Sequence, residues 1–191
     1  SAEARSGGTS VSPYQPAGLG EELMSRAEGA NFTAQTYVQS HGNDLYRRTM
    51  YTFWKRSSPP PSLITFDAPD RETCTVRRSR TNTPLQALIL MNDPTYVEAA
   101  RRFAERIVRS APTTDERIAF AFRMTTARRP NEREIALLRS VYEKQLARYR
   151  ANPTAAGQIL AVGESVRSDD LPADELVGWS LVANVLLNLD E

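Results

Sequence analysis

Cysteine and histidine are almost missing from this chain of 191 residues, which has one of each, Cys74 and His41. A single thiol cannot form an internal disulfide. A single imidazole cannot complete a catalytic triad or a structural metal site without groups from elsewhere. The sequence also lacks a Gly-rich phosphate loop and any metal-ligand spacing. We therefore predict no catalytic residue, no metal and no cofactor in this chain.

Long apolar runs and an excess of one charge are also missing. No apolar stretch reaches the roughly 18 residues that a membrane-spanning helix needs, and the first eight residues lack the pattern of a signal peptide. The 24 Lys and Arg residues nearly balance 23 Asp and Glu residues, which leaves a net charge of +1. This balance argues against nucleic-acid binding, because such binding needs a basic surface.

The start of the chain is rich in glycine, serine and proline. Residues 1–18 show no apolar periodicity and are predicted to form an arm or linker. Three apolar side chains would hold this arm on the core: Val11, Tyr14 and Leu19. The rest, residues 19–191, is predicted to be one helical domain that is a fragment of a larger protein, with an irregular segment over 19–82 wrapped on a helical bundle over 83–189.

Several short patterns lie within the irregular segment. A short helix is expected over 20–27 and a short strand over 32–38. Residues 44–56 are dense in aromatics and fit either a helix or a strand, and we favour a helix. Three consecutive prolines, 59–61, must be extended. The stretch over 62–80 is then a long irregular loop, which is either functional or packed against the domain.

Helix start signals are strong in the second part of the chain. They combine an N-cap side chain with a capping-box partner three residues on, or with proline at the first helical position. The starts are Thr83 with Gln86, Asp93-Pro94, Thr113 with Glu116, Asn131 with Glu134, Asn152-Pro153 and Pro172. Gly163 is expected to end the helix that Asn152-Pro153 begins.

Apolar residues recur at helical spacing between these signals. Five helices joined by short loops predict a mainly α fold, an antiparallel helical bundle with a loop-rich first third. The last helix is apolar on most sides and should be central. The predicted shared core consists of Phe103, Ile107, Ile118, Phe122, Leu138, Tyr142, Trp179, Leu186 and Leu187.

One long segment carries a family resemblance. Residues 41–108 read HGNDLYRRTMYTFWKRSSPPPSLITFDAPDRETCTVRRSRTNTPLQALILMNDPTYVEAARRFAERIV. The segment resembles the planctomycete-specific domain one, a domain of unknown function from Planctomycetes and related bacteria. A weaker similarity reaches from Gly7-Gly8 and the Tyr14-Gln15-Pro16 turn to the closing residues 186–191. Gly20 departs from the family pattern, where tryptophan is expected after Gly18-Leu19.

The resemblance implies a context and no catalytic residues. Similar proteins carry a signal peptide, a cytochrome c domain with a haem-binding Cys-x-x-Cys-His, and a further domain of unknown function upstream. This chain would be the later half of the family's C-terminal domain. The resemblance therefore implies an exported parent protein, in the periplasm or cell envelope. It also implies other domains of that parent as partners, haem outside this chain, and a link to surface polysaccharide.

The loop before the first strong helix holds the one candidate site. Arginine forks beside a helix start can bind phosphate, sulfate or carboxylate groups. The same arginines can pair with nearby carboxylates and carbonyls and so staple the loop internally, and we expect the second role to dominate. The candidate residues are Arg71, Arg77, Arg78, Arg80, Asn82, Asp67 and Asp70.

Other side chains have a functional and a structural interpretation. Asp67, Asp70 and Glu72 would suit glycosidase chemistry or a calcium ion, although salt bridges within the loop fit better beside so many arginines. Cys74 would be a nucleophile if the arginines lowered its pKa, but a small buried residue is expected. His41 is interpreted as a turn residue. The aromatic cluster is a sugar platform or, as we expect, core; it comprises Tyr46, Tyr51, Phe53 and Trp54.

Two functional hypotheses follow from the sequence. The first is a non-catalytic structural or interaction module at the C-terminus of an exported multi-domain bacterial protein. The second is a fragment of a hydrolytic enzyme whose active site is completed by upstream domains, with Asp67, Asp70, Arg71 and Arg77 contributing. The scarcity of catalytic side chains favours the first.

Overall fold

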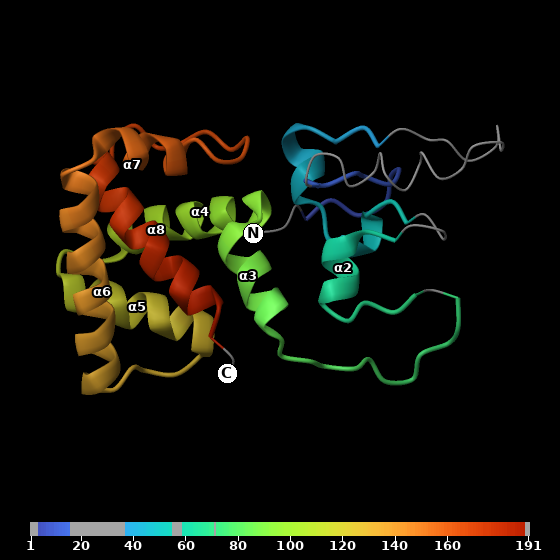
Figure 1. The fold of residues 1–191 in the computed structure, drawn as a ribbon, viewed down its shortest axis with the longest axis horizontal. Coiled ribbons are helices and arrows are strands. Elements are labelled where there is room, and N and C mark those ends of the chain that lie inside the picture. Colours follow the sequence, from blue (N-terminus) through green and yellow to red (C-terminus); the bar gives the residue numbers. More distant parts are fainter. Residues whose placement is uncertain (1–3, 16–36, 55–58, 71, 190–191) are drawn as a thin grey trace. The chain divides into compact units, whose positions relative to one another are not determined.

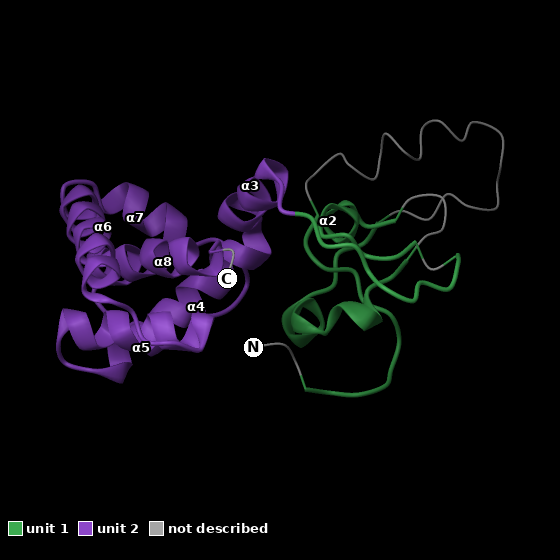
Figure 2. Cartoon of the chain, turned by 90° about the horizontal axis from the view of Figure 1, so that it is seen from below, with its two compact units in different colours: residues 1–81 green, residues 82–191 purple. Residues whose placement is uncertain are grey.

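The computed structural model describes residues 4–15, 37–54, 59–70 and 72–189 (Figure 1). The chain divides into two compact units, residues 1–81 and residues 82–191 (Figure 2). Each unit is described by itself below. The boundary falls one residue from the predicted start of the bundle, while the wrapping of residues 19–82 on that bundle stays a prediction.

The second unit is built of α-helices, as the capping signals predict. Its described residues form α3 (Pro84–Asn92), α4 (Pro94–Ser110), α5 (Thr114–Thr126), α6 (Glu132–Arg150), α7 (Pro153–Leu160) and α8 (Ala173–Leu187). The mainly α fold with packed helices is confirmed. The predicted number of five is wrong, because Asp93 ends α3 and caps α4, so that these two are separate helices.

Local capping explains where these helices begin. Thr83 and Gln86 form a reciprocal capping box, in which Gln86 N donates to Thr83 Oγ1 at 3.3 Å and Thr83 N donates to Gln86 Oε1 at 3.0 Å. Asn131 and Glu134 form a second box at the start of α6. Helix α7 ends at Leu160, before Gly163, so the prediction for its end is wrong. Gly163 has a φ of +88° and shapes the connection that follows.

Helix α8 lies at the centre of the second unit and packs against each of the other five helices (Figure 1). Trp179 is fully buried and stacks on Tyr142 of α6, with ring centroids 4.4 Å apart. A Cβ at Gly178 would lie 3.1 Å from the Tyr142 ring, so a small residue here lets α6 approach closely. The prediction that the apolar last helix is central is confirmed.

Most of the predicted core is buried in one cluster, with two exceptions. Phe103 is only partly buried against that cluster. Leu187 is 39% exposed, so its place in the core is wrong. It is the last residue of α8, and its neighbour Leu186 takes the inward position at that end of the helix.

The first unit contains little regular structure. Its described elements are the 3₁₀-helices η1 (Gly42–Tyr46) and η2 (Thr49–Tyr51) and the short α2 (Pro61–Thr65). Over the described part of 44–56, residues 44–54, the expected helix is therefore replaced by two short 3₁₀ turns. The cause is a pairing with the arm, since Val11 N donates to Tyr51 O and Phe53 N donates to Val11 O, both at 2.8 Å. This parallel bridge holds the backbone extended after Tyr51.

Side chains from the first unit also bind the backbone of the arm. Arg47 is buried and donates from Nη2 to the carbonyls of Arg5 and Gly7, at 3.0 and 2.6 Å. Its guanidinium lies 3.8 Å from the centre of the Tyr51 ring. Within the first unit the arm is thus attached through its backbone carbonyls and through Val11, whose side chain is buried and which bridges to Thr52.

Two earlier expectations, a helix over 20–27 and a strand over most of 32–38, fall outside the described residues. Within the described part of the chain, no helix is both long and apolar enough to span a membrane.

Candidate functional site

A strip of buried charges runs along α4 beside its apolar face. Glu98, Arg101 and Glu105 follow at spacings of three and four residues, which places them on the same side of the helix. Each is only 2% exposed. Arg101 lies between the two carboxylates, with Nη2 3.7 Å from Glu98 Oε1 and Nη1 3.6 Å from Glu105 Oε1. Burial of three charges is costly unless they are paired and hydrogen-bonded.

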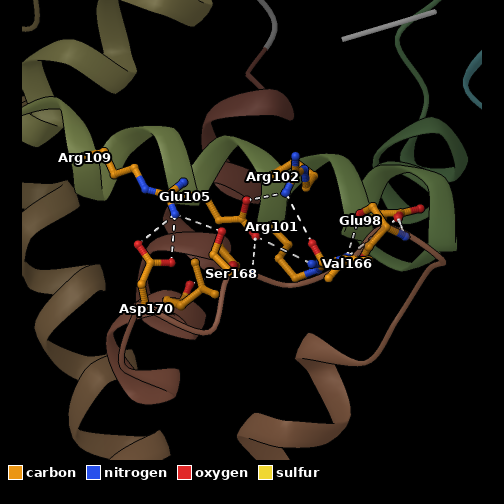
Figure 3. A network of polar contacts seen from close by, with 11 residues as sticks. Glu98, Arg101, Arg102, Glu105, Arg109, Val166, Ser168 and Asp170 are labelled. Carbon is orange, nitrogen blue, oxygen red and sulfur yellow. Dashed lines mark hydrogen bonds and ion pairs between the residues drawn. The ribbon is translucent and has the colours of Figure 1, made fainter.

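The cover over these charges is the connection between α7 and α8, residues 161–172, which we call the strap (Figure 3). Ser165 N donates to Glu98 Oε1 at 2.5 Å. Arg101 Nη2 in turn donates to the carbonyl and the hydroxyl of Ser165, at 2.7 and 2.8 Å. Ser168 N lies 3.4 Å from Glu105 Oε1. The charges of α4 therefore satisfy backbone groups of a segment that has no helix or strand of its own.

Two further arginines lie at the edge of the cluster formed by Glu98, Arg101 and Glu105, and bind acidic side chains there (Figure 3). Arg102 is half exposed and donates to Glu105 Oε2 at 2.6 Å. Arg109 donates to Ser168 Oγ at 2.9 Å and to both oxygens of Asp170, at 2.9 and 3.0 Å. Its hydrogen bond lowers the pKa of the Asp170 carboxyl below the ordinary value of 3.8. The arginines at the edge thus neutralise acids of α4 and of the strap.

Gly163 is the point where the strap turns over α4. Its φ of +88° lies in the region that favours glycine. A Cβ on this residue would overlap the side chain of Glu98. The absence of a side chain at this position lets the strap backbone reach the buried carboxylate.

Sequence reasoning missed this cluster, although a signal was present. The pattern Glu98-x-x-Arg101-x-x-x-Glu105 sets charges of alternating sign along one helix face, which is usually a solvated face. The covering residues lie 63 to 67 positions later in the chain. No pattern within α4 indicates that such a segment returns to it.

The loop that carries the predicted site residues is exposed throughout residues 72–82. Arg78 donates from Nε to Asp67 O at 2.8 Å and from Nη2 to Phe66 O. Arg77 and Arg80 extend from the same loop and are exposed. Arg71 lies outside the described residues, and Asn82 is an exposed residue at the start of the second unit. The structure thus places Arg78 on backbone carbonyls of its own unit.

The predicted carboxylates also hold the loop backbone. Asp67 accepts from Thr81 N at 2.8 Å and from Thr81 Oγ1 at 2.8 and 3.0 Å. Asp70 Oδ1 accepts from the backbone of Glu72 at 2.9 Å and of Thr73 at 3.4 Å, as in an Asx turn. Asp67 has a φ of +58°, which aspartate tolerates better than most residues. These contacts close the loop between Asp67 and Thr81.

The remaining candidates belong to the first unit, whereas the buried cluster belongs to the second. Cys74 is exposed, so the expectation of a buried cysteine is wrong. The loop there has no apolar packing that would cover it. His41 precedes η1 as its N-cap residue, as expected of a turn residue. Of the predicted aromatic cluster, Tyr46, Tyr51 and Trp54 are partly buried. Phe53 is 38% exposed, so its assignment to a core is wrong.

Among the residues that the structure describes, no group of three or more His, Cys, Asp and Glu side chains is arranged to hold a metal ion.

The fold and the polar cluster define a helical domain whose buried charges join its own segments. The chain belongs to the family PSD1, described as "Protein of unknown function (DUF1553)", whose model matches residues 1–142. The match covers the first unit and ends within α6 at Tyr142, the residue that stacks on Trp179 of α8. No curated protein matches the chain, and no solved structure matches it either.

Proposed function

We propose that this chain is a non-catalytic structural or interaction module in the C-terminal part of a larger, exported bacterial protein. The observation that carries the proposal is the use of the buried charges of α4. Glu98 and Arg101 bind the backbone of the strap, and Glu105 is bound by the exposed guanidinium of Arg102. A catalytic group needs a free face toward a substrate, whereas these groups face their own chain.

Other charged pairs of the second unit join its helices in the same way. Arg117 of α5 donates to Glu175 of α8 at 2.6 Å, and Arg150 of α6 donates to Asp174 of α8 at 2.8 Å. Arginine suits this task because its planar fork binds carboxylates with defined geometry. Because these charged side chains bind one another between helices, they support a role of the chain as a scaffold.

A role in binding other domains is supported by the exposed apolar side chains of α3. This helix of nine residues has no charged side chain, and its Leu85, Leu88 and Met91 are 55%, 54% and 47% exposed. They follow at intervals of three residues, on one side of the helix. We propose that other domains of the parent protein contact this side. The double substitution Leu85→Ser and Leu88→Ser should weaken binding of the purified upstream domains and leave the helical content unchanged; unchanged binding would contradict the proposal.

The wider context rests on the family resemblance. We infer that the parent is exported to the periplasm or cell envelope, that this chain is the later half of a planctomycete-specific domain, and that the parent is linked to surface polysaccharide. Haem would belong to an upstream domain, because the lone Cys74 and lone His41 cannot form a Cys-x-x-Cys-His attachment. Fractionation of cells that make the full-length protein tests export, and a cytoplasmic location would contradict it.

The test of the non-catalytic role is a panel of sulfated and plain polysaccharides, esters and peptides. We expect no turnover of any of them by the purified chain. Turnover that Asp67→Asn or Cys74→Ala abolishes without unfolding would instead favour the alternative, a fragment of a hydrolytic enzyme. Binding of a polysaccharide without turnover would support the proposed link to surface glycans.

A further inference from the structure

The last part of the first unit is an exposed segment with three arginines. Residues 72–81 are exposed without exception, and Val76 is as exposed as in an extended peptide, at 104%. The segment has no helix or bridge, and Figure 1 shows it as a plain green trace after α2. It ends at Thr81, the last residue before the second unit. Proteases need an exposed chain without regular structure, since they bind their substrate in an extended form.

The three arginines of this segment differ in how firmly they are held. The Arg78 side chain is bound to the carbonyls of Phe66 and Asp67. The peptide bond after Arg80 is fixed at its nitrogen, because Thr81 N donates to Asp67 Oδ2 at 2.8 Å. The side chain of Arg77 has no such anchor to any described residue and is exposed. Among these three arginines, Arg77 is therefore the one for which neither the side chain nor the nitrogen of the following peptide bond is held by another described residue.

We propose that the Arg77–Arg78 peptide bond is a processing site for an arginine-specific, trypsin-like protease. The guanidinium of Arg77 would enter the acidic specificity pocket of such an enzyme. Hydrolysis adds one water across the bond, so that the Arg77 carbonyl carbon becomes a carboxylate and the Arg78 nitrogen becomes an amine. The products are residues 1–77 and residues 78–191.

The structure also indicates what the cut leaves behind. The second unit starts after the scissile bond, and its first helix has its complete capping box from Thr83 and Gln86. The core around α8 comes entirely from residues after the cut. After cleavage the helical unit would thus keep its own caps and core.

The first experiment is limited proteolysis of the intact chain with trypsin, followed by intact-mass measurement. We expect the product that begins at Arg78 to be the dominant early fragment in the second half of the chain. Arg77→Gln should abolish this fragment, because trypsin does not cut after glutamine, and should slow the loss of the intact chain by on the order of tenfold, because the Arg78 side chain and the nitrogen of the bond after Arg80 are held by hydrogen bonds. The matched control is Arg106→Gln, an exposed arginine within α4, which should leave the rate unchanged. Early cuts within 82–189, or an unaltered rate in Arg77→Gln, would overturn the proposal.

A second variant tests the role of the Asp67 contacts. Asp67→Gly keeps a residue that tolerates the positive φ and removes the acceptor for Thr81. We expect cleavage at Arg80–Thr81 to rise at least several-fold in this variant and to match cleavage after Arg77. Cleavage at Arg80–Thr81 that already equals cleavage after Arg77 in the unaltered chain would show that the anchors do not select the bond.

The third measurement asks whether processing occurs in cells. An antibody against the second unit, applied to cells that make the full-length protein, should detect a fragment whose first residue is Arg78. Loss of this fragment in Arg77→Gln would support the proposal. Detection of the uncut protein alone, while the purified chain is readily cut by trypsin, would contradict a role in processing.

Discussion

Each of the two units of this chain is stabilised internally by a different kind of interaction. The second unit buries a continuous apolar cluster around α8, with Trp179 and Leu176 fully enclosed. In the first unit the buried apolar side chains among the described residues are Val11 and Leu45. That unit depends instead on side chains that bind distant backbone, such as Arg47 on the carbonyls of the arm. Apolar burial is non-directional, whereas each hydrogen bond needs its partner in a defined place.

This difference has a consequence for the buried charges. In the second unit the paired charges of α4 lie against a large core, which can offset the cost of removing them from water. In the first unit comparable polar contacts, those of Arg78 and Asp67, lie at the exposed surface. The same types of side chain should therefore matter much more in the second unit. The following predictions test this contrast, from the largest expected effect to the smallest.

The largest effect should come from Arg101→Met in α4. The substitution keeps most of the volume but leaves Glu98 and Glu105 buried without their shared cation. We expect a loss of about 3–5 kcal/mol in the free energy of unfolding, measured by chemical denaturation. Arg106→Met is the matched control on the exposed side of α4 and should change stability by less than about 0.5 kcal/mol. Equal effects of the two would show that the buried cluster is not special.

Removal of apolar contact should have the next largest effect. Leu186→Ala takes a nearly fully buried side chain out of the core and should cost about 2–5 kcal/mol. Leu187→Ala, one residue on and 39% exposed, should cost clearly less. Denaturation curves that do not separate the two would mean that the end of α8 is not packed as described.

The strap should be sensitive at Gly163. Gly163→Ala imposes a positive φ on a residue with a Cβ and brings that atom into the Glu98 side chain. We expect a loss of about 1–3 kcal/mol and faster hydrogen exchange at Ser165 N, which Glu98 holds. Gly157→Ala is the control, because a Cβ there meets no other atom within 4 Å. Unchanged exchange at Ser165 in Gly163→Ala would argue against the hydrogen bond from Ser165 N to Glu98.

A smaller effect is expected for the arginines of the first unit. Arg78→Ala removes two hydrogen bonds to carbonyls and should cost about 0.5–1.5 kcal/mol, since the site is exposed. Arg77→Ala and Arg80→Ala should be neutral. Each variant is melted with and without sulfate. If all three are as stable as the parent and sulfate protects the parent alone, the loop is an anion site and the staple interpretation is wrong.

The smallest effect should be that of acid on surface pairs of the second unit. Hydrogen bonds from Arg150 and Arg128 lower the pKa of Asp174 below 3.8 and that of Glu134 below 4.5. A depressed folded-state pKa adds stability that is present above the unfolded value and is lost as the pH falls through the folded value. The melting temperature should therefore fall below about pH 4.5, and less so at high salt. A rise on acidification would contradict these pairings.

Much of the second unit could be predicted from the sequence because its signals are local. The box of Thr83 and Gln86 spans three residues, so each partner lies within reach once the first turn forms. The structure of the first unit was predicted less well from the sequence. A helix is expected over residues 44–56, but Val11, some forty positions earlier, pairs with residues 51–53 and holds the backbone extended after Tyr51. Local pattern carries no information about such a partner.

The sequence by itself determined the helical class, the starts of the helices and the central place of α8, because capping and apolar periodicity act between residues three or four apart. The tertiary structure decided that Glu98, Arg101 and Glu105 are buried. Ser165, the partner of Glu98 and Arg101, lies 64 residues from Arg101 and 67 from Glu98. A charged helix face is solvated or buried depending on which segment covers it, and that choice is made only when the chain packs.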